Sequence, residues 1–222
     1  NQLRRDRLHQ KTGPGLHRAL TALLLLAPET PMLFMGQEFG ASAPFLFFAD
    51  FPAGELARQI HQGRKQFLAQ FPSYASAEAQ AAVADPRDPA VFQRSKIDWS
   101  ERERHAGYVR LHRDLLRLRR EDPVIAQQAR DRMDGAVIGP AAFVLRYAGE
   151  QGDDRLLLIN LGADCDYRPA PEPLLAPPDG RTWHLLWSSD APEYGGPGVI
   201  EPLTETGWVI PGGSAALYSV QG

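Results

Sequence analysis

One stretch decides the expected fold: Pro31-Met-Leu-Phe-Met-Gly-Gln-Glu-Phe-Gly40. Its apolar half predicts a short buried strand from Met32 to Met35, and Pro31 can begin a strand although it cannot donate a ladder hydrogen bond. Gly36 then permits a sharp turn into a loop that carries Glu38. A polar loop with a carboxylate at the C-terminal end of a buried strand is where (β/α)8 barrels keep their chemistry. We therefore expect this part of the chain to come from a barrel.

A helix is expected immediately before this stretch. Thr12-Gly-Pro-Gly15 is typical of a helix start, with Pro14 near the first turn, and the helix should run to about Ala27. It is nearly all apolar from Leu20 on, which indicates that it packs on both sides or leads into a buried strand. A helix, a short loop and a buried strand make one step of an α/β layer.

Two longer helices are expected after the stretch, separated by a weakly periodic region. Residues 54–71 carry a helical apolar stripe, whereas 72–97 should be mostly loop with a short helix over 75–83. Ser100-Glu-Arg-Glu103 has the capping-box pattern of a helix start. The charged run Arg113–Glu121 in the helix that follows is expected to face solvent.

From about Met133 the pattern changes to short apolar runs separated by Gly, Pro and Asp clusters. The predicted strands are Ala136–Ile138, Ala142–Tyr147, Arg155–Asn160, Thr182–Trp187, Gly207–Ile210 and Ala215–Val220. Such a series predicts an antiparallel β-sandwich. The expected fold class is therefore α/β followed by all-β. Residues 1–125 would be the C-terminal part of a (β/α)8 TIM barrel, and residues 126–222 would form a β-sandwich domain.

Composition excludes several classes of function. The 222 residues have a formal net charge of −3 and a pI of about 6.1, so no nucleic-acid or anionic-membrane partner is expected. The longest apolar run, Ala22–Ala27, is far shorter than the roughly 20 residues that span a bilayer. Cys165 is the single cysteine, which agrees with a reducing, cytoplasmic location. No dinucleotide, phosphate-loop or zinc motif occurs, so we expect no cofactor and no metal.

The candidate site residues are acidic and aromatic. Glycoside hydrolysis uses two carboxylates, and Glu38 and Asp50 are the acidic candidates near the expected strand end. Each could instead be an ion pair or a loop cap, with Arg58 or Arg64 as the partner of Asp50. The aromatic loop contains Phe45, Phe47, Phe48 and Phe51, which could stack on sugar rings or anchor the loop in a core.

Three tryptophans fall in the β part, at positions 183, 187 and 208. They are expected in the core or at its rim, and the alternative is a carbohydrate-binding platform. Exposed, coplanar rings would favour the platform, and buried rings would not.

Several segments together resemble one family of enzymes. They are Arg5-Asp-Arg-Leu8, Met32–Gly40, Phe47-Phe-Ala-Asp-Phe51, Gly63-Arg-Lys-Gln-Phe67, Asp85-Pro-Arg-Asp-Pro89 and Ser95-Lys-Ile-Asp-Trp99. Met32–Gly40 resembles the segment at the eighth barrel strand of the α-amylase superfamily of glycoside hydrolases. The set as a whole resembles the malto-oligosyltrehalose trehalohydrolases, and the resemblance is weakest in the β part.

The resemblance implies an activity and a substrate. Enzymes of this family hydrolyse the α-1,4 bond next to the terminal trehalose of maltooligosyl trehalose and release trehalose, without a metal or organic cofactor. Maltooligosyl trehalose or a related α-glucan is then the expected partner, and Glu38, Phe48 and Asp50 are the expected substrate-binding residues. The family's Asp nucleophile, Glu general acid and stabilising Asp belong to earlier motifs, and none of them maps onto a residue of this sequence. We therefore expect a truncated C-terminal fragment that lacks the catalytic residues and is inactive by itself.

Two alternatives remain open at this point. A glycogen branching enzyme or another α-glucan transferase would share the Met-Gly-Gln-Glu segment but should lack Phe47–Phe51. A non-catalytic carbohydrate-binding module would use the sandwich as its working part.

Overall fold

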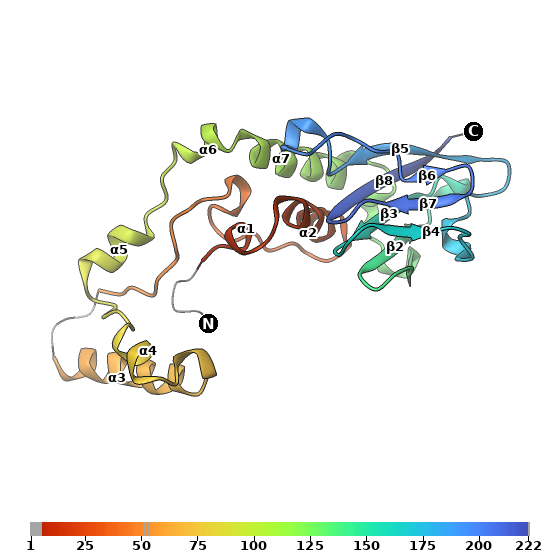
Figure 1. The fold of residues 1–222 in the computed structure, drawn as a ribbon. Helices are drawn as coiled ribbons and strands as arrows, with labels where there is room; N and C mark the ends of the chain where they lie inside the picture. Colours follow the sequence, from red (N-terminus) through yellow and green to blue (C-terminus); the bar gives the residue numbers. More distant parts are fainter. Residues whose placement is uncertain (1–5, 51, 53, 222) are drawn as a thin grey trace. The chain divides into compact units, whose positions relative to one another are not determined.

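The computed structural model describes residues 6–50, 52 and 54–221, which divide into two compact units (Figure 1). The helical unit holds the described residues up to Lys11 together with Gly40–Glu101. The sheet unit holds Thr12–Phe39 and the described residues from Arg102 on. Each unit is thus built from segments that lie far apart in the sequence.

Two antiparallel sheets form the centre of the sheet unit. The larger has the order β1-β2-β3-β8-β5, with bounds Met133–Val137, Ala142–Tyr147, Arg155–Asn160, Ser214–Gln221 and Thr182–Ser188. The smaller has the order β4-β7-β6, with bounds Cys165–Tyr167, Gly207–Ile210 and Leu203–Thr204. The predicted antiparallel sandwich is therefore confirmed, and the very short strands β4 and β6 are the ones that the sequence pattern missed.

Strand β3 is buried on both faces. Successive side chains of a strand point to opposite faces. Leu156 and Leu158 contribute to the core shared with the small sheet, whereas Leu157 and Ile159 contribute to a second core on the other face. All four side chains are fully buried. The larger sheet therefore needs a cover on each side.

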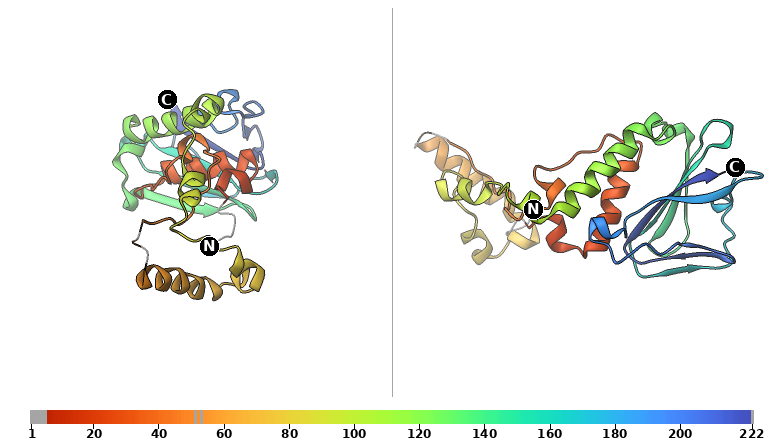
Figure 2. Two further views of the ribbon diagram at one scale, coloured as in Figure 1. Left: turned by 90° about the vertical axis from the view of Figure 1, so that its left-hand side faces the viewer. Right: turned by 90° about the horizontal axis from the view of Figure 1, so that it is seen from above.

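The second cover is a pair of helices, α2 (Pro14–Leu26) and α7 (Ala106–Glu121). Figure 2 shows them side by side against the face of the larger sheet. Leu25 from α2 and Leu111 and Leu115 from α7 lie in the same core as β3, each fully buried. The apolar character of α2 is thus explained by burial between α7 and the sheet.

Arg119 joins the two helices at the C-terminal end of α2. Its guanidinium donates to the carbonyl oxygens of Leu25 at 3.0 Å, Ala27 at 2.5 Å and Glu29 at 2.8 Å. The last carbonyls of a helix have no partner within it, and a cation there also interacts favourably with the helix dipole. Arg119 is buried, so the prediction that the whole run Arg113–Glu121 faces solvent is wrong at this residue.

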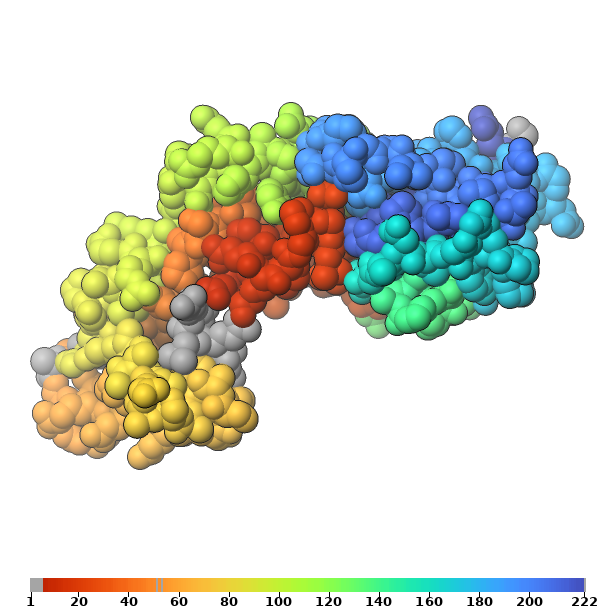
Figure 3. All heavy atoms as spheres, viewed as in Figure 1, coloured from red at the N-terminus to blue at the C-terminus, as the bar shows by residue number. Residues whose placement is uncertain are grey.

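A short 3-10 helix, η7 (Pro192–Tyr194), packs against α7. The Tyr194 hydroxyl donates to Asp114 Oδ2 at 3.0 Å and accepts from Trp187 Nε1 at 3.1 Å. Burial raises the pKa of Tyr194 to about 12, so its hydroxyl keeps the proton that it donates. Figure 3 shows the blue segment around η7 beside the green α7 on the surface.

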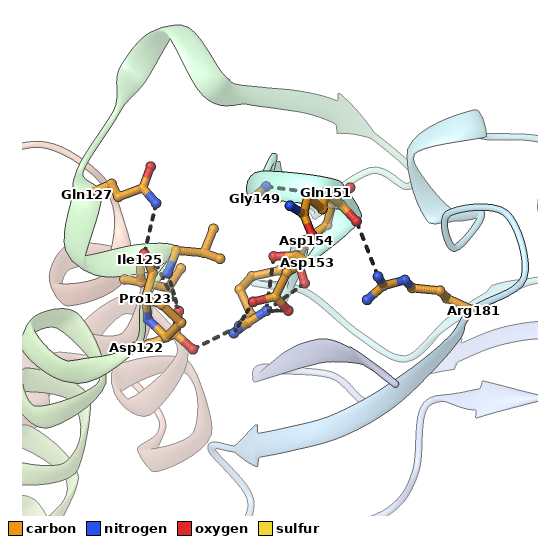
Figure 4. A network of polar contacts seen from close by, with 11 residues as sticks. Asp122, Pro123, Ile125, Gln127, Gly149, Gln151, Asp153, Asp154 and Arg181 are labelled. Atoms are coloured by element: carbon orange, nitrogen blue, oxygen red, sulfur yellow. Dashed lines mark hydrogen bonds and ion pairs between the residues drawn. The ribbon is translucent and has the colours of Figure 1, made fainter. Parts of the chain in front are cut away.

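A second buried guanidinium, that of Arg155, anchors the start of β3. Arg155 Nε donates to Asp122 Oδ2 at 2.8 Å, and Nη1 donates to Asp153 Oδ1 at 2.7 Å. Asp122 also accepts from the backbone of Val124 and Ile125 through Oδ1, at 3.0 Å each. Figure 4 shows Asp122 and Asp153 turned toward the same point, so the end of α7 and the start of β3 are tied together.

The predicted buried strand from Met32 to Met35 is wrong for this chain. The segment has no strand conformation, and the side chains of Met32, Phe34 and Met35 are 85%, 46% and 53% exposed. Leu33 alone packs against the helix-covered core. A buried strand requires hydrogen-bonded neighbours, and among the described residues none pairs with this segment. The barrel itself stays a prediction.

The predicted capping box at Ser100–Glu103 is also wrong. The Ser100 hydroxyl donates to Asp98 Oδ1 at 2.6 Å instead of capping a helix. Glu101–Arg104 forms the separate short helix α6, and α7 begins later with His105 as its N-cap. Ser-x-x-Glu is only a permissive pattern, because a nearby carboxylate can bind the serine first.

The helical unit contains short helices joined by turns. Its elements are α1 (Leu8–Lys11), α3 (Glu55–Ala69), η2 (Pro72–Tyr74), α4 (Ala77–Ala81) and α5 (Pro89–Ser95). The region 72–97 is thus more helical than the sequence predicted. Asp88 caps α5 by accepting from Ala90 N at 2.8 Å, the role that an Asp before Pro suits. Leu68, Tyr74 and Val91 are buried side chains of this unit.

Removing the carboxylate of Asp122 should destabilise the sheet unit. Arg155 and Asp122 are both buried, and breaking a buried pair by removing one partner typically costs about 3–5 kcal/mol. Asp122→Ala is therefore expected to lower the free energy of unfolding by that amount in urea. Asp166→Ala breaks the exposed pair with Arg168 and should leave the urea midpoint unchanged. Equal midpoints for the two variants would show that the buried pair contributes nothing.

The division of the chain at 125/126 stays a prediction. Because α2 and α7 cover the larger sheet, residues 126–222 are expected to need these helices in order to fold, and a fragment can test this. Residues 126–222 alone would expose the face of the larger sheet that α2 and α7 cover. This fragment is therefore expected to bind an apolar dye and to unfold without a cooperative transition. The whole chain should show a cooperative transition under the same conditions. Cooperative unfolding of the fragment with the whole chain's midpoint would show instead that the sandwich is an independent domain.

Candidate substrate-binding site

Glu38 lies in a tight loop of the sheet unit. It is half-buried within the 3-10 helix η1 (Gln37–Phe39), between Gly36 with φ 83° and Gly40 with φ 61°. Positive φ angles favour glycine, as the sequence predicted for the turn at Gly36. Phe39 anchors the loop because its side chain is fully buried and its carbonyl accepts from His105 Nδ1 at 3.0 Å.

His112 lies on α7 within electrostatic range of Glu38. Its Nδ1 donates to the Tyr108 carbonyl at 2.9 Å, since a carbonyl oxygen can only accept. Its Nε2 is buried without a hydrogen-bond partner in the described part of the chain. Burial lowers the pKa of His112, and the Tyr108 carbonyl and the charge of Glu38 oppose this shift without outweighing it. The lowered pKa of His112 therefore favours a neutral imidazole near Glu38.

Phe48 and Asp50 lie in the helical unit and line one hollow of about 520 Å³. This volume is within the range of roughly 300–1,000 Å³ that is usual for small-molecule sites. The other lining residues are Ala49, Pro86, Arg87, Asp88, Pro89 and Phe92. The structure thus brings Phe48 and Asp50 together, and it adds Arg87 and Phe92, which the sequence analysis did not single out.

Two hydrogen bonds link the aromatic loop to the segment that carries Arg87 and Phe92. Ala49 N donates to the Pro86 carbonyl at 2.9 Å, and Leu46 N donates to Ser95 Oγ at 3.1 Å. The turn that carries Arg87 is itself braced by Asp85. Arg87 Nε and Nη2 donate to the Asp85 carboxylate at 3.3 and 2.9 Å, and these hydrogen bonds lower the pKa of Asp85. The Arg87 guanidinium therefore lies beside the hollow in a local, partly exposed pair with Asp85.

Three aromatic rings gather at the hollow. Phe48 and Phe92 lie edge to face, with ring centroids 5.1 Å apart and an interplanar angle of 67°. Phe45 lies 5.8 Å from Phe48 at 58°. Phe45 and Phe92 are partly exposed, at 38% and 43%. Phe51 lies outside the described residues. The Asp-Pro pair at 88–89 indicates a helix start ahead of Phe92, but it carries no signal that this helix lies beside the aromatic loop.

The suggested arginine partners of Asp50 are engaged elsewhere. Arg58 donates to Glu55 Oε2 from Nε at 3.1 Å, and the Arg64 guanidinium lies 4.2 Å from the centre of the Phe47 ring. Asp50 is exposed, and it makes no ion pair among the described residues. Its role in binding stays a prediction, but a loop-holding pair with either arginine is absent.

The tryptophans of the sandwich are buried. Trp183, Trp187 and Trp208 are 7%, 8% and 3% exposed. Trp183 Nε1 donates to the Leu175 carbonyl at 2.9 Å, and the ring of Trp208 packs edge to face on Tyr218. The three tryptophans lie in the core, as expected, so they form no exposed aromatic platform on the surface of the sandwich.

Two searches of the described ranges gave negative results. Residues 6–50, 52 and 54–221 contain no group of three or more His, Cys, Asp or Glu side chains that could hold a metal ion. No helix within the same ranges is both long enough and apolar enough to cross a membrane.

Comparisons with known proteins identify relatives of the chain. Residues 130–210 match a family described as a domain of unknown function, DUF3459. The chain is 44% identical over 161 residues to malto-oligosyltrehalose trehalohydrolase of Deinococcus radiodurans, across 72% of this chain and 26% of that protein. It is 34% identical over 186 residues to the enzyme of the same name from Mycobacterium tuberculosis, across 83% of this chain and 29% of that protein. The chain therefore spans about a quarter of the length of these relatives.

Two solved structures have a fold similar to that of nearly the whole chain. An α-amylase candidate from Salmonella typhimurium matches 99% of this chain and 33% of its own, at 27% identity and a TM-score of 0.70. The trehalose-6-phosphate hydrolase of Bacillus licheniformis matches 100% of this chain and 42% of its own, with a TM-score of 0.59. At 12% identity the second match shows the fold alone.

The buried His112 should make the sheet unit less stable as the pH falls. Because burial lowers its pKa from 6.5, the imidazole stays neutral in the folded chain, while the unfolded chain takes up a proton below about pH 6.5. The unfolded state then binds more protons, so the free energy of unfolding decreases as the pH drops from 7 to 5. Urea titrations of His112→Gln should show a weaker dependence on pH over this range. His184→Gln, at an exposed position of β5, should keep the dependence of the parent chain, and equal slopes for all three proteins would contradict the assignment.

Proposed function

Because the chain is a relative of the malto-oligosyltrehalose trehalohydrolases, which are glycoside hydrolases of the α-amylase family, we propose that it forms part of such an enzyme. The enzyme would hydrolyse the α-1,4 bond next to the terminal trehalose of maltooligosyl trehalose and release trehalose. The observation that carries the proposal is the 44% identity across 72% of the chain. The single cysteine agrees with a cytoplasmic enzyme.

The exposed segment from Met32 to Met35 supports a place beside a barrel. Met32 is 85% exposed and Met35 is 53% exposed, although both are apolar and follow a helix packed on a sheet. Contiguous apolar surface of this kind commonly marks an interaction site. In the proposed enzyme, parallel strands of a (β/α)8 barrel contributed by the rest of the protein would cover this segment and give it the strand conformation that it lacks here.

We place substrate contacts at Glu38, Phe48 and Asp50, each within its own unit. Glu38 is presented by a loop that two glycines shape, and Asp50 is an exposed carboxylate beside aromatic rings. Carboxylates bind sugar hydroxyls and rings pack on the apolar faces of sugars. The nucleophile, the general acid and the stabilising Asp would come from the rest of the enzyme, so the chain by itself would not catalyse the reaction.

The two alternatives are less well supported. The relatives described above carry the trehalohydrolase name, which does not favour a glycogen branching enzyme or another α-glucan transferase. The buried tryptophans leave the sandwich without the aromatic platform that would favour a non-catalytic carbohydrate-binding module.

The activity can be tested by measuring trehalose release from maltotriosyl trehalose. A longer reading frame that carries this chain should release trehalose, whereas the 222-residue chain should not, because loss of a nucleophile and a general acid costs many orders of magnitude in rate. Turnover by the chain at the rate of the longer protein would contradict the missing catalytic residues. Transfer of glucan chains by the longer protein, without trehalose release, would support the α-glucan transferase instead.

Substitutions in the longer protein should separate substrate contact from structure. Glu38→Gln and Asp50→Asn are each expected to lower kcat/KM about 10- to 150-fold, the loss expected for one charged hydrogen bond of roughly 1.5–3 kcal/mol. The melting temperature should stay unchanged, because neither side chain holds the fold. Glu55→Gln, which alters an exposed pair with Arg58, is the control and should change neither quantity. A lowered melting temperature with normal kcat/KM would make Glu38 and Asp50 structural.

A further inference from the structure

The hollow in the helical unit combines partly exposed aromatic rings with charged side chains. Phe92 lies on α5 with 43% of its surface exposed, and it lines the same hollow as Phe48. In an edge-to-face pair, the edge of one ring covers part of the face of the other, so the two rings cannot cover each other completely. Ring surface in the hollow is therefore left for a ligand with an apolar face.

The polar groups around these rings supply both donors and acceptors. Arg87 uses Nε and Nη2 to bind Asp85, and a guanidinium has five N–H donors, so Nη1 remains for a ligand. Asp50 makes no ion pair among the described residues and offers a carboxylate. Asp88 gives Oδ1 to the cap of α5 and keeps its other oxygen. A ligand with neighbouring hydroxyl groups could bind both kinds of group at once.

The charged side chains around the hollow carry both signs. The lining includes two anionic residues, Asp50 and Asp88, and one cationic residue, Arg87. The Lys96 ammonium lies 5.2 Å from the centre of the Phe92 ring. A ligand that donates to the carboxylates and accepts from the guanidinium can use groups of both signs. A sugar ring is neutral, has apolar faces and carries hydroxyl groups at its rim, so it matches the rings and the polar groups together.

We propose that this hollow is a subsite for a glucosyl unit of an α-glucan, in which Phe92 and Phe48 pack on the sugar ring and Arg87 and Asp50 bind its hydroxyls. Phe92 and Arg87 are thereby assigned as specificity-determining residues. The choice of an α-glucan rests on the proposed function, whereas the choice of a sugar rests on the hollow itself.

Binding of maltotetraose to the 222-residue chain tests the subsite by calorimetry. Phe92→Ala and Arg87→Ala are expected to weaken binding about tenfold or more, the loss expected for a ring contact or one charged hydrogen bond. Phe92→Trp keeps an aromatic face and should restore binding. Phe67→Ala removes a Phe on α3 that is 56% exposed and does not line the hollow, so it should bind like the parent chain. Thermal melts should show that all four variants are folded.

Three outcomes would overturn the proposal. They are no binding of maltotetraose to the parent chain, equal affinities of Phe92→Ala and Phe67→Ala, and binding of cellotetraose as tight as that of maltotetraose. Failure of the proposed function looks different: the longer protein would release no trehalose although its Phe92-dependent binding of maltotetraose persists. Failure of the subsite alone would leave trehalose release intact and unchanged by Phe92→Ala.

Discussion

The two-sided apolar character of the larger sheet is the constraint on which the sheet unit depends. Because Leu156 and Leu158 alternate with Leu157 and Ile159 along β3, neither face can be left to water. The small sheet covers one face and the helices α2 and α7 cover the other, although more than a hundred residues of sequence separate α2 from β3. The same requirement fixes the loop that carries Glu38, since η1 packs against α7 and is bound to it through His105.

Buried guanidiniums then set how the layers meet. Apolar surfaces are non-directional, so they bury area without fixing the position of a helix along a sheet. Arg119 binds carbonyls at the end of α2, Arg155 binds the carboxylate at the end of α7, and Arg18 Nη2 binds Asp190 at 3.2 Å beyond β5. A buried charge is costly unless its partners are in place, so each of these contacts penalises a shifted arrangement. The polar contacts thus give the unit its alignment, and the apolar layers give it most of its stability.

The sequence predicts those features whose signal is local. Strands β2, β3 and β7 have the predicted bounds, because each is a short, mostly apolar run with turn-forming residues on both sides. Strands β4 and β6 have three and two residues, too few for alternation to be seen. The apolar run at 32–35 carries a strand signal, but strand conformation depends on neighbours that a local pattern cannot report. The burial of Arg119 was missed for the same reason, since its partners lie on α2.

The candidate site likewise contains residues with a local sequence signal and residues that only tertiary contacts bring in. Phe48 and Asp50 could be predicted to lie together, because only Ala49 separates them in an aromatic, acidic loop, and both line one hollow. Arg87 and Phe92 could not, because they join that hollow through the bond from Ala49 N to the Pro86 carbonyl, a contact between segments almost forty residues apart. A sugar ring needs contacts from several directions, because aromatic rings pack on its apolar face while polar side chains bind the hydroxyl groups at its rim. The proposed recognition of a sugar ring therefore depends on tertiary structure, because the aromatic loop supplies only one side of the hollow.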